Sequence, residues 1–523
     1  MLCLVALSGC SSASDSGAAQ PTQAPAPEVQ SIEVVADPSV DAADMADPYA
    51  QADRYSAEIY HPDRELYNAL FQAVLNREES MGLSNFSLSY KEKYDAASVL
   101  LSESGYHFFY LNNFKLSDDG SSIRFIYYDM DGEQIAYGRE TFDARLSHLL
   151  YDVAPADGSD LQKFVAIYSF LCDNSHYTSE IGDPTTISPY SILVNGEGIC
   201  GGYAELMQKA LAQQGIEAEY VCCEAHAWDV VKLNGTWYQT DVTWGAGTGD
   251  DAWGTLAYML MDDAERIGGL TDAGYGSETR MVGYPGGSGA ALPACTDDAF
   301  GAYGTVGYPF ALDVEGGKIY FCDGNGIDCM NLDCTGFQTL VPGDSCYAMF
   351  YFNGALYYDS ADSGAVCRLV PGGQPEVLDS SEPFYFMKLD GTELTYAANA
   401  IGTDAKTVDL LLLPAETGSA EQLPGVSVSR GESFAAQVRF TEPMDETQNW
   451  NECVYLVNDQ GTAIPCSFAY DDASNTLTLR PKDYIDENSA LTVYVTDGAA
   501  AQNGETLKNC FSSQIKLISQ VES

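Results

Sequence analysis

Residues 196–245 read GEGICGGYAELMQKALAQQGIEAEYVCCEAHAWDVVKLNGTWYQTDVTWG, and this stretch decides the fold around which the chain is arranged. From Cys200 onward, apolar residues recur at helical spacing, at positions 203, 206, 207, 210 and 211. Gly215 stands where a helix of this length takes a left-handed cap. The pattern therefore predicts a helix that begins at Cys200.

A cysteine in the first turn of a helix meets partial positive charge and unpaired N–H groups, which favour the nucleophilic thiolate. Three glycines surround this cysteine, at positions 198, 201 and 202. The backbone there can approach a substrate carbonyl closely and offer N–H groups to an oxyanion. We therefore expect a nucleophile at Cys200, with the oxyanion role as a hypothesis.

The segment after the helix alternates with period two on both sides of Asn234-Gly235, a pair typical of a two-residue hairpin turn. In such a hairpin the residue numbers of two residues that pair across the strands sum to 469. His226 and Asp241 are then diagonal neighbours on the same face of the hairpin. The opposite, core-side face is expected to carry Ala227, Val231, Leu233, Tyr238, Val242 and Trp244. A bulge would shift this register and turn Asp241 to the wrong face.

These residues predict a nucleophilic site in which His226 is the base of Cys200 and Asp241 holds the tautomer of the imidazole. A lone cysteine is more often a small buried side chain, and a lone histidine is more often structural. Here a cysteine, a histidine and an aspartate lie on a helix end and a hairpin that can bring them together, which favours a catalytic site. His176, in an expected loop without a carboxylate in register, is the weaker rival base.

Several motifs in this order resemble the core of the transglutaminase-like superfamily, in its bacterial branch with a papain-like fold. They are GICGGYA (198–204), HAWD (226–229) and WYQTDVTW (237–244), supported by an expected helix at 160–172, by YSIL (190–193) and by YMLM (258–261). The likeness covers about a fifth of the chain.

The resemblance implies a triad of Cys200, His226 and Asp241 that transfers acyl groups through a thioester, without a cofactor. Two departures stand out. Asp229 replaces a common Asn and by the register points to the opposite face. No Trp or Gln immediately before Cys200 supplies a side-chain oxyanion donor, which leaves Tyr190 and the Cys200 backbone as weak candidates.

The N-terminus begins MLCLVALSGC, in which Leu7 to Cys10 have the form of a bacterial lipobox. This predicts lipidation of Cys10 and an extracellular protein that is attached to the bacterial cell membrane only through that lipid. A positively charged leader region is missing, and an ordinary apolar N-terminus is the alternative. Residues 11–52 are rich in Ala, Pro, Ser, Asp and Gln, which predicts a disordered tether.

Composition narrows the possible partners. The 523 residues include 76 acidic and 24 basic ones, for a net charge of -52, which excludes nucleic acid as a partner. Hydrophobic residues make up 46%, enough for several folded cores. We expect a peptide, protein or cell-wall polymer as the substrate.

The chain has 15 cysteines, and without Cys3 and Cys10 the remaining number is odd, which fits at least one free thiol. Cys200 would be that thiol, and Cys453 and Cys466 are a possible disulfide pair. No cysteine spacing fits a zinc site, so no metal is expected.

Composition and patterning divide the chain into seven parts and predict a multidomain α+β protein. The parts are a signal-peptide remnant with the lipobox (1–10), the tether (11–52), an N-terminal α+β segment (53–150), the transglutaminase-like catalytic domain (151–267), a Gly-rich linker (268–300), a β-repeat module (301–413) and an Ig-like β-sandwich (423–520). In the N-terminal segment we expect strands at 106–110 and 123–128, with a turn at 129–132 that leads into a third at 134–137.

Two β-rich regions follow the papain-like core. Three similar hairpins, centred on Ile319, Leu356 and Leu394, recur 37 and 38 residues apart and suggest propeller-like repeats in an open module, because three blades do not close a ring. In the last region the motif FTEPMD (440–445) is similar to bacterial Ig-like domains of cell-surface proteins.

The function predicted from these features is cysteine-dependent acyl transfer on peptide or amide bonds at the cell surface or wall. Hydrolysis is favoured because water is always available outside a cell. Protein cross-linking is the first alternative, and a surface adhesion or scaffold protein without catalysis is the second.

Overall fold

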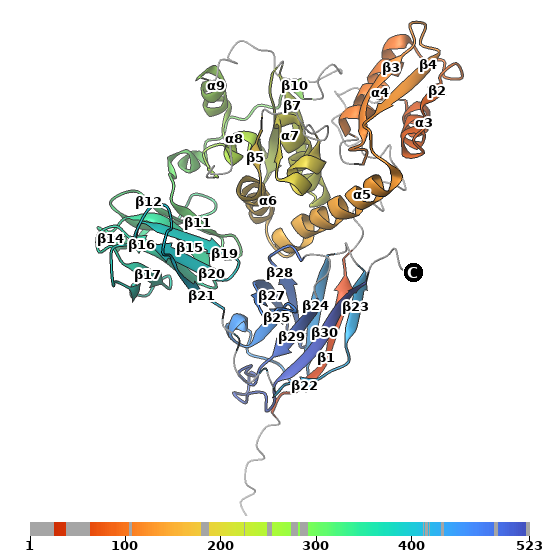
Figure 1. Ribbon diagram of the computed structural model, residues 1–523. Helices are drawn as coiled ribbons and strands as arrows, with labels where there is room; N and C mark the ends of the chain where they lie inside the picture. The colour runs from red at the N-terminus through yellow and green to blue at the C-terminus, as the bar shows by residue number, and fades with distance from the viewer. Residues whose placement is uncertain are drawn as a thin grey trace, which may run out of the picture.

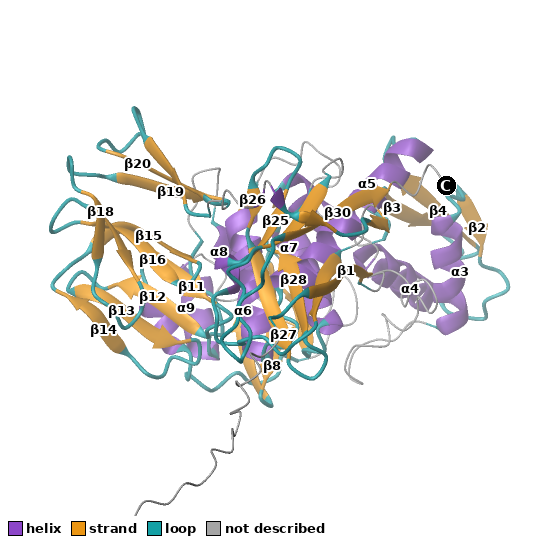
Figure 2. Cartoon of the chain, turned by 90° about the horizontal axis from the view of Figure 1, so that it is seen from below, coloured by secondary structure: helices purple, strands orange, loops and turns teal. Residues whose placement is uncertain are grey.

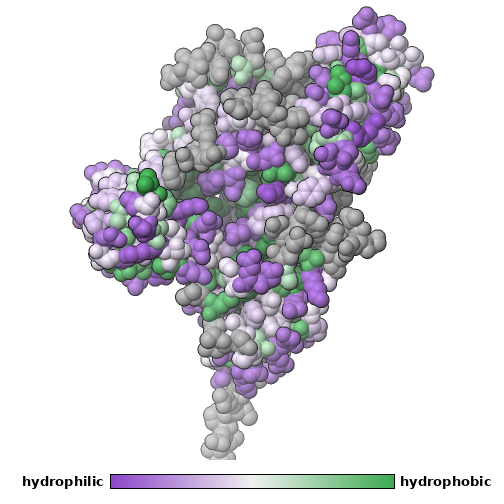
Figure 3. Space-filling view, in the orientation of Figure 1, coloured by the Kyte–Doolittle hydropathy of each residue, from purple (hydrophilic) through white to green (hydrophobic). Residues whose placement is uncertain are grey.

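The computed structural model describes residues 26–37, 63–103, 107–178, 188–223, 225–247, 254–272, 281–282, 291–411, 413, 417, 419–429, 433–485 and 490–518. Figures 1 and 2 show four units that pack side by side, and hydrophilic residues cover much of the coloured surface in Figure 3. Within the described ranges, every helix is too short or too polar to cross a membrane. Cys10, the expected lipidation site, lies outside these residues.

The N-terminal unit is a three-stranded antiparallel sheet, ordered β2-β4-β3, with two helices packed on it. Its elements are α3 (Arg64–Leu75), β2 (Ser80–Gly82), α4 (Tyr90–Glu103), β3 (Leu111–Leu116) and β4 (Ser122–Tyr127). The strand expected at 106–110 is wrong, because strand pairing begins only at Leu111. The strand expected at 134–137 is also wrong: Asp131 and Gln134 form a capping box, which begins a helix there.

The central unit comprises the described residues between 132 and 282 and is built on helix α7 and the antiparallel sheet β10-β7-β8-β9. Helix α7 packs on strands β7 and β8, and helix α6 lies against α7 and α8. The elements are α5 (Gly132–Ser147), the π-helical turns η1 (His148–Val153) and η2 (Ser191–Asn195), α6 (Asp160–Asn174), β5 (His176–Tyr177), β6 (Glu197–Gly198), α7 (Cys200–Gln213), β7 (Ala218–Cys222), β8 (Ala227–Leu233), β9 (Thr236–Thr240), α8 (Val242–Ala246), α9 (Asp263–Asp272) and β10 (Met281–Val282).

The hairpin register predicted from Asn234-Gly235 is confirmed. Leu233 pairs with Thr236 and Asp229 with Thr240, so that each pair sums to 469. Asn234 and Gly235 have φ of 51° and 86°, as a tight hairpin turn with both central residues left-handed requires. The predicted helix also begins at Cys200, and Gly215 follows its end with φ of 79°.

Part of the expected Gly-rich linker, 268–300, is regular structure. Helix α9 continues to Asp272, and β10 pairs with β7. Asp262 and Glu265 each accept a hydrogen bond from the other's backbone N–H, at 2.7 and 3.1 Å, and this capping box begins α9. The local cap and the packing of α9 therefore override the weak helix propensity of Gly268 and Gly269.

The three predicted repeats form three antiparallel sheets, and the predicted hairpins contain their second strands, β12, β16 and β20. Among the described residues no sheet closes on itself, so the module is a row of sheets and a propeller is not shown. After the short helix η3 (Gly301–Thr305), the strands are β11 (Phe310–Asp313), β12 (Lys318–Cys322), β13 (Gly326–Asn331), β14 (Gln338–Pro342), β15 (Cys346–Phe352), β16 (Ala355–Ser360), β17 (Val366–Leu369), β18 (Glu376–Asp379), β19 (Phe386–Asp390), β20 (Glu393–Ala397) and β21 (Lys406–Asp409).

The last unit is a sandwich of two sheets around one hydrophobic core. One sheet is β1-β24-β28-β27, and the other contains β22, β23, β30, β29, β25 and β26. The strands are β1 (Val29–Ala36), β22 (Glu421–Gln422), β23 (Val426–Ser429), β24 (Phe434–Phe440), β25 (Val454–Val457), β26 (Ala463–Ile464), β27 (Cys466–Asp471), β28 (Thr476–Pro481), β29 (Leu491–Val495) and β30 (Phe511–Ile518), with a short helix η5 (Trp450–Glu452) before β25. Cys453 and Cys466, the possible disulfide pair, are both free thiols here.

Strand β1 corrects the expected tether at 11–52. Val29 and Ile32 are buried in the sandwich core, and β1 pairs antiparallel with β24. Strand β1 gains its stability from a partner some 400 positions away in sequence (residue 440 against 29), so the local composition carries no sign of it. A segment of the expected tether is therefore an integral strand of the C-terminal unit.

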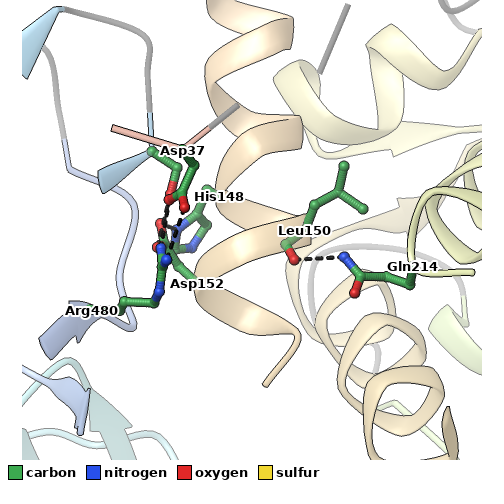
Figure 4. Close-up of polar contacts among 7 residues, drawn as sticks. Asp37, His148, Leu150, Asp152, Gln214 and Arg480 are labelled. Carbon is green, nitrogen blue, oxygen red and sulfur yellow. Dashed lines mark hydrogen bonds and ion pairs between the residues drawn. The ribbon is translucent and has the colours of Figure 1, made fainter. Parts of the chain in front are cut away.

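The central unit and the sandwich meet at a polar cluster (Figure 4). His148 Nδ1 lies 3.0 Å from Asp152 Oδ2, and the Ser433 hydroxyl donates to Asp152 Oδ1 at 2.9 Å. Arg480 binds both carboxylate oxygens of Asp37 at 2.5 and 2.8 Å and lies 3.5 Å from Asp152 Oδ1. We call these five residues the junction cluster.

Candidate active site

Cys200 is the first residue of α7 and is half-buried. The preceding residues are held by the short parallel pair β5–β6, in which Thr178 N–H donates to Gly198 O at 3.0 Å. Because the first N–H groups of a helix have no intrahelical acceptor, the amides of Cys200 and Gly201 point out from the end of α7. The sulfur thus lies at a positively polarised helix end that is fixed to the sheet.

His226 lies immediately before β8 and is 7% exposed. Its Nε2 is 2.7 Å from Asp241 Oδ2, and the Cys200 thiol is close enough to help raise the pKa of the imidazole. The ring stacks between Trp228 and Trp244, at centroid distances of 5.7 and 5.4 Å. One imidazole therefore joins the predicted nucleophile to the predicted carboxylate.

Asp241 follows β9 as the N-cap of helix α8, and its Oδ1 accepts the Trp244 N–H at 3.0 Å. The sequence placed Trp244 on the core-side face, and this prediction is wrong. The period-two pattern ends at Thr240, where the chain enters the helix, so the Trp244 ring turns back against His226. Asp241 nevertheless faces His226 as predicted.

Arg266, on α9, is the residue of the site that the sequence reasoning missed. Its Nη2 is 2.6 Å from Asp241 Oδ2, and its side chain is 1% exposed. The guanidinium carbon lies 4.7 Å from the centroid of Trp228 and 4.3 Å from that of Trp244. The same two indoles thus contact both the imidazole and the guanidinium. The D-x-x-E pattern of 262–265 was the signal for the helix that carries Arg266.

These contacts set the charges of the site. Burial alone would raise the pKa of Asp241, but the positive charges of Arg266 and His226, with the hydrogen bonds from His226 and Trp244, hold it below the ordinary value. Burial alone would lower the pKa of His226, but Asp241 and the hydrogen bond with Cys200 raise it to about 9. At neutral pH the site therefore holds an Asp241 carboxylate and a His226 imidazolium.

Asp229 lies in the next strand position after Trp228 and is 1% exposed. Neither of its carboxyl oxygens has a hydrogen-bond partner among the described residues. Burial, with the negative charge of Asp241, raises its pKa well above the ordinary range, which favours the protonated acid.

The two weaker candidates from the sequence have other surroundings. Tyr190 stacks on Phe109 of the N-terminal unit at a centroid distance of 4.2 Å, which makes it part of the contact between two units. His176 is in strand β5, and its Nε2 lies 3.6 Å from Glu197 Oε2. The expectation that His176 has no partner carboxylate is therefore wrong.

Comparisons with known proteins agree with this architecture. A family model described as the transglutaminase-like superfamily matches residues 148–242, and one described as a bacterial Ig-like domain matches residues 425–514. Residues 148–242 thus form a transglutaminase-like domain, and members of that superfamily are usually cysteine-dependent enzymes. The expected Ig-like domain is confirmed.

Among curated proteins, the kyphoscoliosis peptidase of Mus musculus is 26% identical over 141 residues, which are 23% of this chain and 21% of that protein. The same protein of Homo sapiens is 25% identical over 141 residues, with the same coverage of both chains. This chain thus spans about a fifth of the length of these relatives. A putative cysteine protease from Cytophaga hutchinsonii is 18% identical, with 32% of this chain and 61% of that chain covered and a TM-score of 0.18.

Proposed function

We propose that this protein is an extracellular cysteine enzyme that transfers acyl groups from peptide or amide substrates through a thioester on Cys200. The observation that carries the proposal is the imidazole of His226, which is hydrogen-bonded to Asp241 and lies beside the Cys200 thiol. A nucleophile, a base and an orienting carboxylate, brought together by helix α7 and strands β8 and β9, are what an acyl-transfer site requires.

In the proposed reaction the Cys200 thiolate attacks the substrate carbonyl and forms a tetrahedral intermediate. The His226 imidazolium then gives its Nδ1 proton to the leaving amine as the C–N bond breaks, which leaves a thioester. A second nucleophile loses a proton to the neutral imidazole and attacks the thioester carbonyl, and breakage of the C–S bond releases the product and restores the Cys200 thiolate and the His226 imidazolium. Asp241, bound to Nε2, keeps the ring oriented throughout.

The backbone amides of Cys200 and Gly201 are the proposed oxyanion donors. They are the first two N–H groups of α7, where the helix itself supplies no acceptor. A Cβ on Gly201 would lie 3.5 Å from the Tyr220 hydroxyl, an ordinary van der Waals contact, so side chains of other elements do not crowd this residue. This proposal replaces the Tyr190 side chain, which is packed against Phe109.

We propose hydrolysis as the fate of the thioester and a peptide, protein or cell-wall polymer as the substrate. The β-repeat module and the sandwich would present such a polymer to the central unit, to which the N-terminal unit and both β-rich units are packed. A lipid on Cys10 would hold the enzyme at the outer face of the bacterial membrane.

The test uses peptide and cell-wall fragment mixtures, incubated with the full chain and with Cys200→Ala, and mass analysis of the products. Hydroxylamine is added in a parallel arm because it intercepts a thioester as a hydroxamic acid. We expect Cys200-dependent hydrolysis products and, with hydroxylamine, hydroxamates. Products that instead join two substrate chains would identify a cross-linking enzyme, and no Cys200-dependent product would favour a scaffold.

A further inference from the structure

The contact of Arg266 with Asp241 is the most deeply buried ion pair among the described residues, with exposed side-chain fractions of 1% and 0%. Only Nη2 of the guanidinium makes a hydrogen bond there, whereas Nε and Nη1 have no hydrogen-bond partner within the described part of the chain. The guanidinium carbon lies over the rings of both Trp228 and Trp244. A buried cation with so few hydrogen bonds is costly to maintain, which calls for an explanation.

The explanation lies in the carboxylate that Arg266 contacts. Asp241 is completely buried, and a buried carboxylate without a cation takes up a proton far more readily than an exposed one. The His226 imidazolium supplies one positive charge, but that charge is lost whenever His226 gives up its proton during a reaction cycle. Arginine keeps its charge at all working pH values, so Arg266 compensates Asp241 at every stage.

The other titratable groups around this pair do not supply such a charge. Burial raises the pKa of the Tyr168 phenol, the Cys172 thiol and the Asp229 carboxyl, and none of these groups carries a positive charge in either protonation state. Cys223 and Tyr258 face the guanidinium itself and cannot carry a positive charge either. Among the described residues in contact with the site, Arg266 is thus the permanent cation.

We propose that Arg266 is a positioning residue that keeps Asp241 ionised and thereby holds His226 in the orientation that activates Cys200, over a wider and more acidic pH range than the three groups would reach alone. The two indoles fix the guanidinium in place by contact with its faces, in the way that aromatic rings hold cations. The same rings stack on His226, so one pair of tryptophans aligns the base and the cation. This inference rests on the proposed function of Cys200.

The test measures the rate at which iodoacetamide alkylates Cys200 between pH 4 and pH 9, by peptide-resolved mass spectrometry. Arg266→Gln keeps a hydrogen-bond donor but removes the charge, and Arg266→Lys keeps the charge but not the planar group. Loss of a nearby positive charge makes every ionisation that creates negative charge harder. We expect the pH of half-maximal rate to rise by about one unit or more in Arg266→Gln and to stay within about 0.3 units in Arg266→Lys.

Arg480→Gln is the matched control, because Arg480 also binds an aspartate at 2.5 Å but in the junction cluster. It is expected to leave the profile of Cys200 unchanged. A loss of packing alone would lower the rate in Arg266→Gln without moving the pH of half-maximal rate, and that result, or equal shifts in both Arg266 variants, would overturn the inference. If wild-type Cys200 is itself no more reactive than an unfolded thiol, the proposed function fails instead.

If Arg266→Gln does not fold, urea unfolding distinguishes an Arg266 that compensates the charge of Asp241 from an Arg266 that stabilises the fold independently. The single variant Asp241→Asn leaves Arg266 as a buried charge without a counterion, whereas Asp241→Asn/Arg266→Gln removes both charges. The inference predicts that the double variant unfolds at the same or higher urea concentration than Asp241→Asn. A double variant that unfolds at a lower concentration would show that Arg266 stabilises the fold independently of Asp241, contrary to the inference.

Discussion

Two clusters in this molecule contain the same three residue types in similar geometry. At the candidate active site His226, Asp241 and Arg266 have His–Asp and Arg–Asp distances of 2.7 and 2.6 Å. In the junction cluster His148, Asp152 and Arg480 have distances of 3.0 and 3.5 Å. A histidine beside a buried aspartate is thus present twice, at one place with a thiol on the other side of the ring and at the other place without one.

The two clusters differ in which carboxylate the arginine binds. Arg266 is directed at Asp241, whereas Arg480 binds both oxygens of Asp37 and only approaches Asp152. Burial accordingly raises the pKa of Asp152, against the opposing effects of His148, Ser433 and Arg480, whereas the pKa of Asp241 is lowered. A His–Asp contact alone therefore does not distinguish the two clusters, whereas the nucleophile and the dedicated cation are particular to the proposed catalytic site.

The largest expected effect is a difference in Cys200 alkylation rate between variants of His226 and His148. His226→Ala removes the imidazolium beside Cys200, and an ordinary cysteine is only a few per cent thiolate at pH 7 and less at pH 6. Alkylation of Cys200 at pH 6 should fall roughly a hundredfold. His148→Ala, the matched change in the junction cluster, should leave this rate within about twofold. Equal losses in the two variants would remove the distinction between the clusters.

A smaller loss of Cys200 reactivity is expected when Asp241, the residue after β9, is replaced. Almost no loss is expected when Asp229, a buried aspartate of β8, is replaced. Asp241→Asn cannot hold His226 in the same tautomer, and the alkylation rate at pH 6 should fall roughly tenfold. Asp229→Asn keeps the size of the side chain, and neither oxygen of Asp229 has a hydrogen-bond partner among the described residues, so the rate should change by less than about twofold. A large loss in Asp229→Asn would show that its acid form takes part in the site.

The pH dependence of stability should follow the titration of His226. The folded-state pKa of His226, about 9, lies above its ordinary value of 6.5, so its contribution is complete below pH 6.5 and is lost as pH rises through 9. The difference corresponds to about 3 kcal/mol. Urea unfolding followed by tryptophan fluorescence should show the free energy of unfolding fall over this window in wild type and His148→Ala. In His226→Ala the fall should be absent.

The smallest effect concerns two neighbouring glycines of α9. A Cβ at Gly269 would lie 3.1 Å from Trp244 Cζ3, whereas a Cβ at Gly268 would meet nothing within 4 Å. Gly268→Ala should therefore raise the free energy of unfolding by about 0.5–1 kcal/mol through helix propensity. In Gly269→Ala the displacement of the Trp244 ring should offset that gain and slow the alkylation of Cys200. Identical stability and reactivity in both variants would argue against a fixed Trp244 ring.

Much of the site followed from local sequence patterns. Asn234-Gly235 determined the hairpin register, and the helical spacing after Cys200 determined where α7 begins. Both patterns work because turn conformation and amphipathic periodicity are properties of a few neighbouring residues. The side on which Asp241 faces His226 followed from them, although the strand ends at Thr240 and the expected alternation does not continue to Trp244.

The features that were missed depend on residues distant in sequence or on local signals that compete. Arg266 lies beside a run of glycines that suggested a linker, and the capping box at Asp262 outweighed that composition. Strand β1 forms only because β24 is present to pair with it. The contact of Arg266 with two tryptophans from other elements has no sequence periodicity at all.

The most direct test of the central claim is the alkylation rate of Cys200 at pH 6 in the native wild-type chain, relative to the same thiol in the chain unfolded by urea. If sulfur, imidazole and carboxylate act as one group, native Cys200 should react at least about ten times faster, because its thiolate is stabilised by the neighbouring imidazolium. A native Cys200 that reacts no faster than the unfolded thiol would contradict the account.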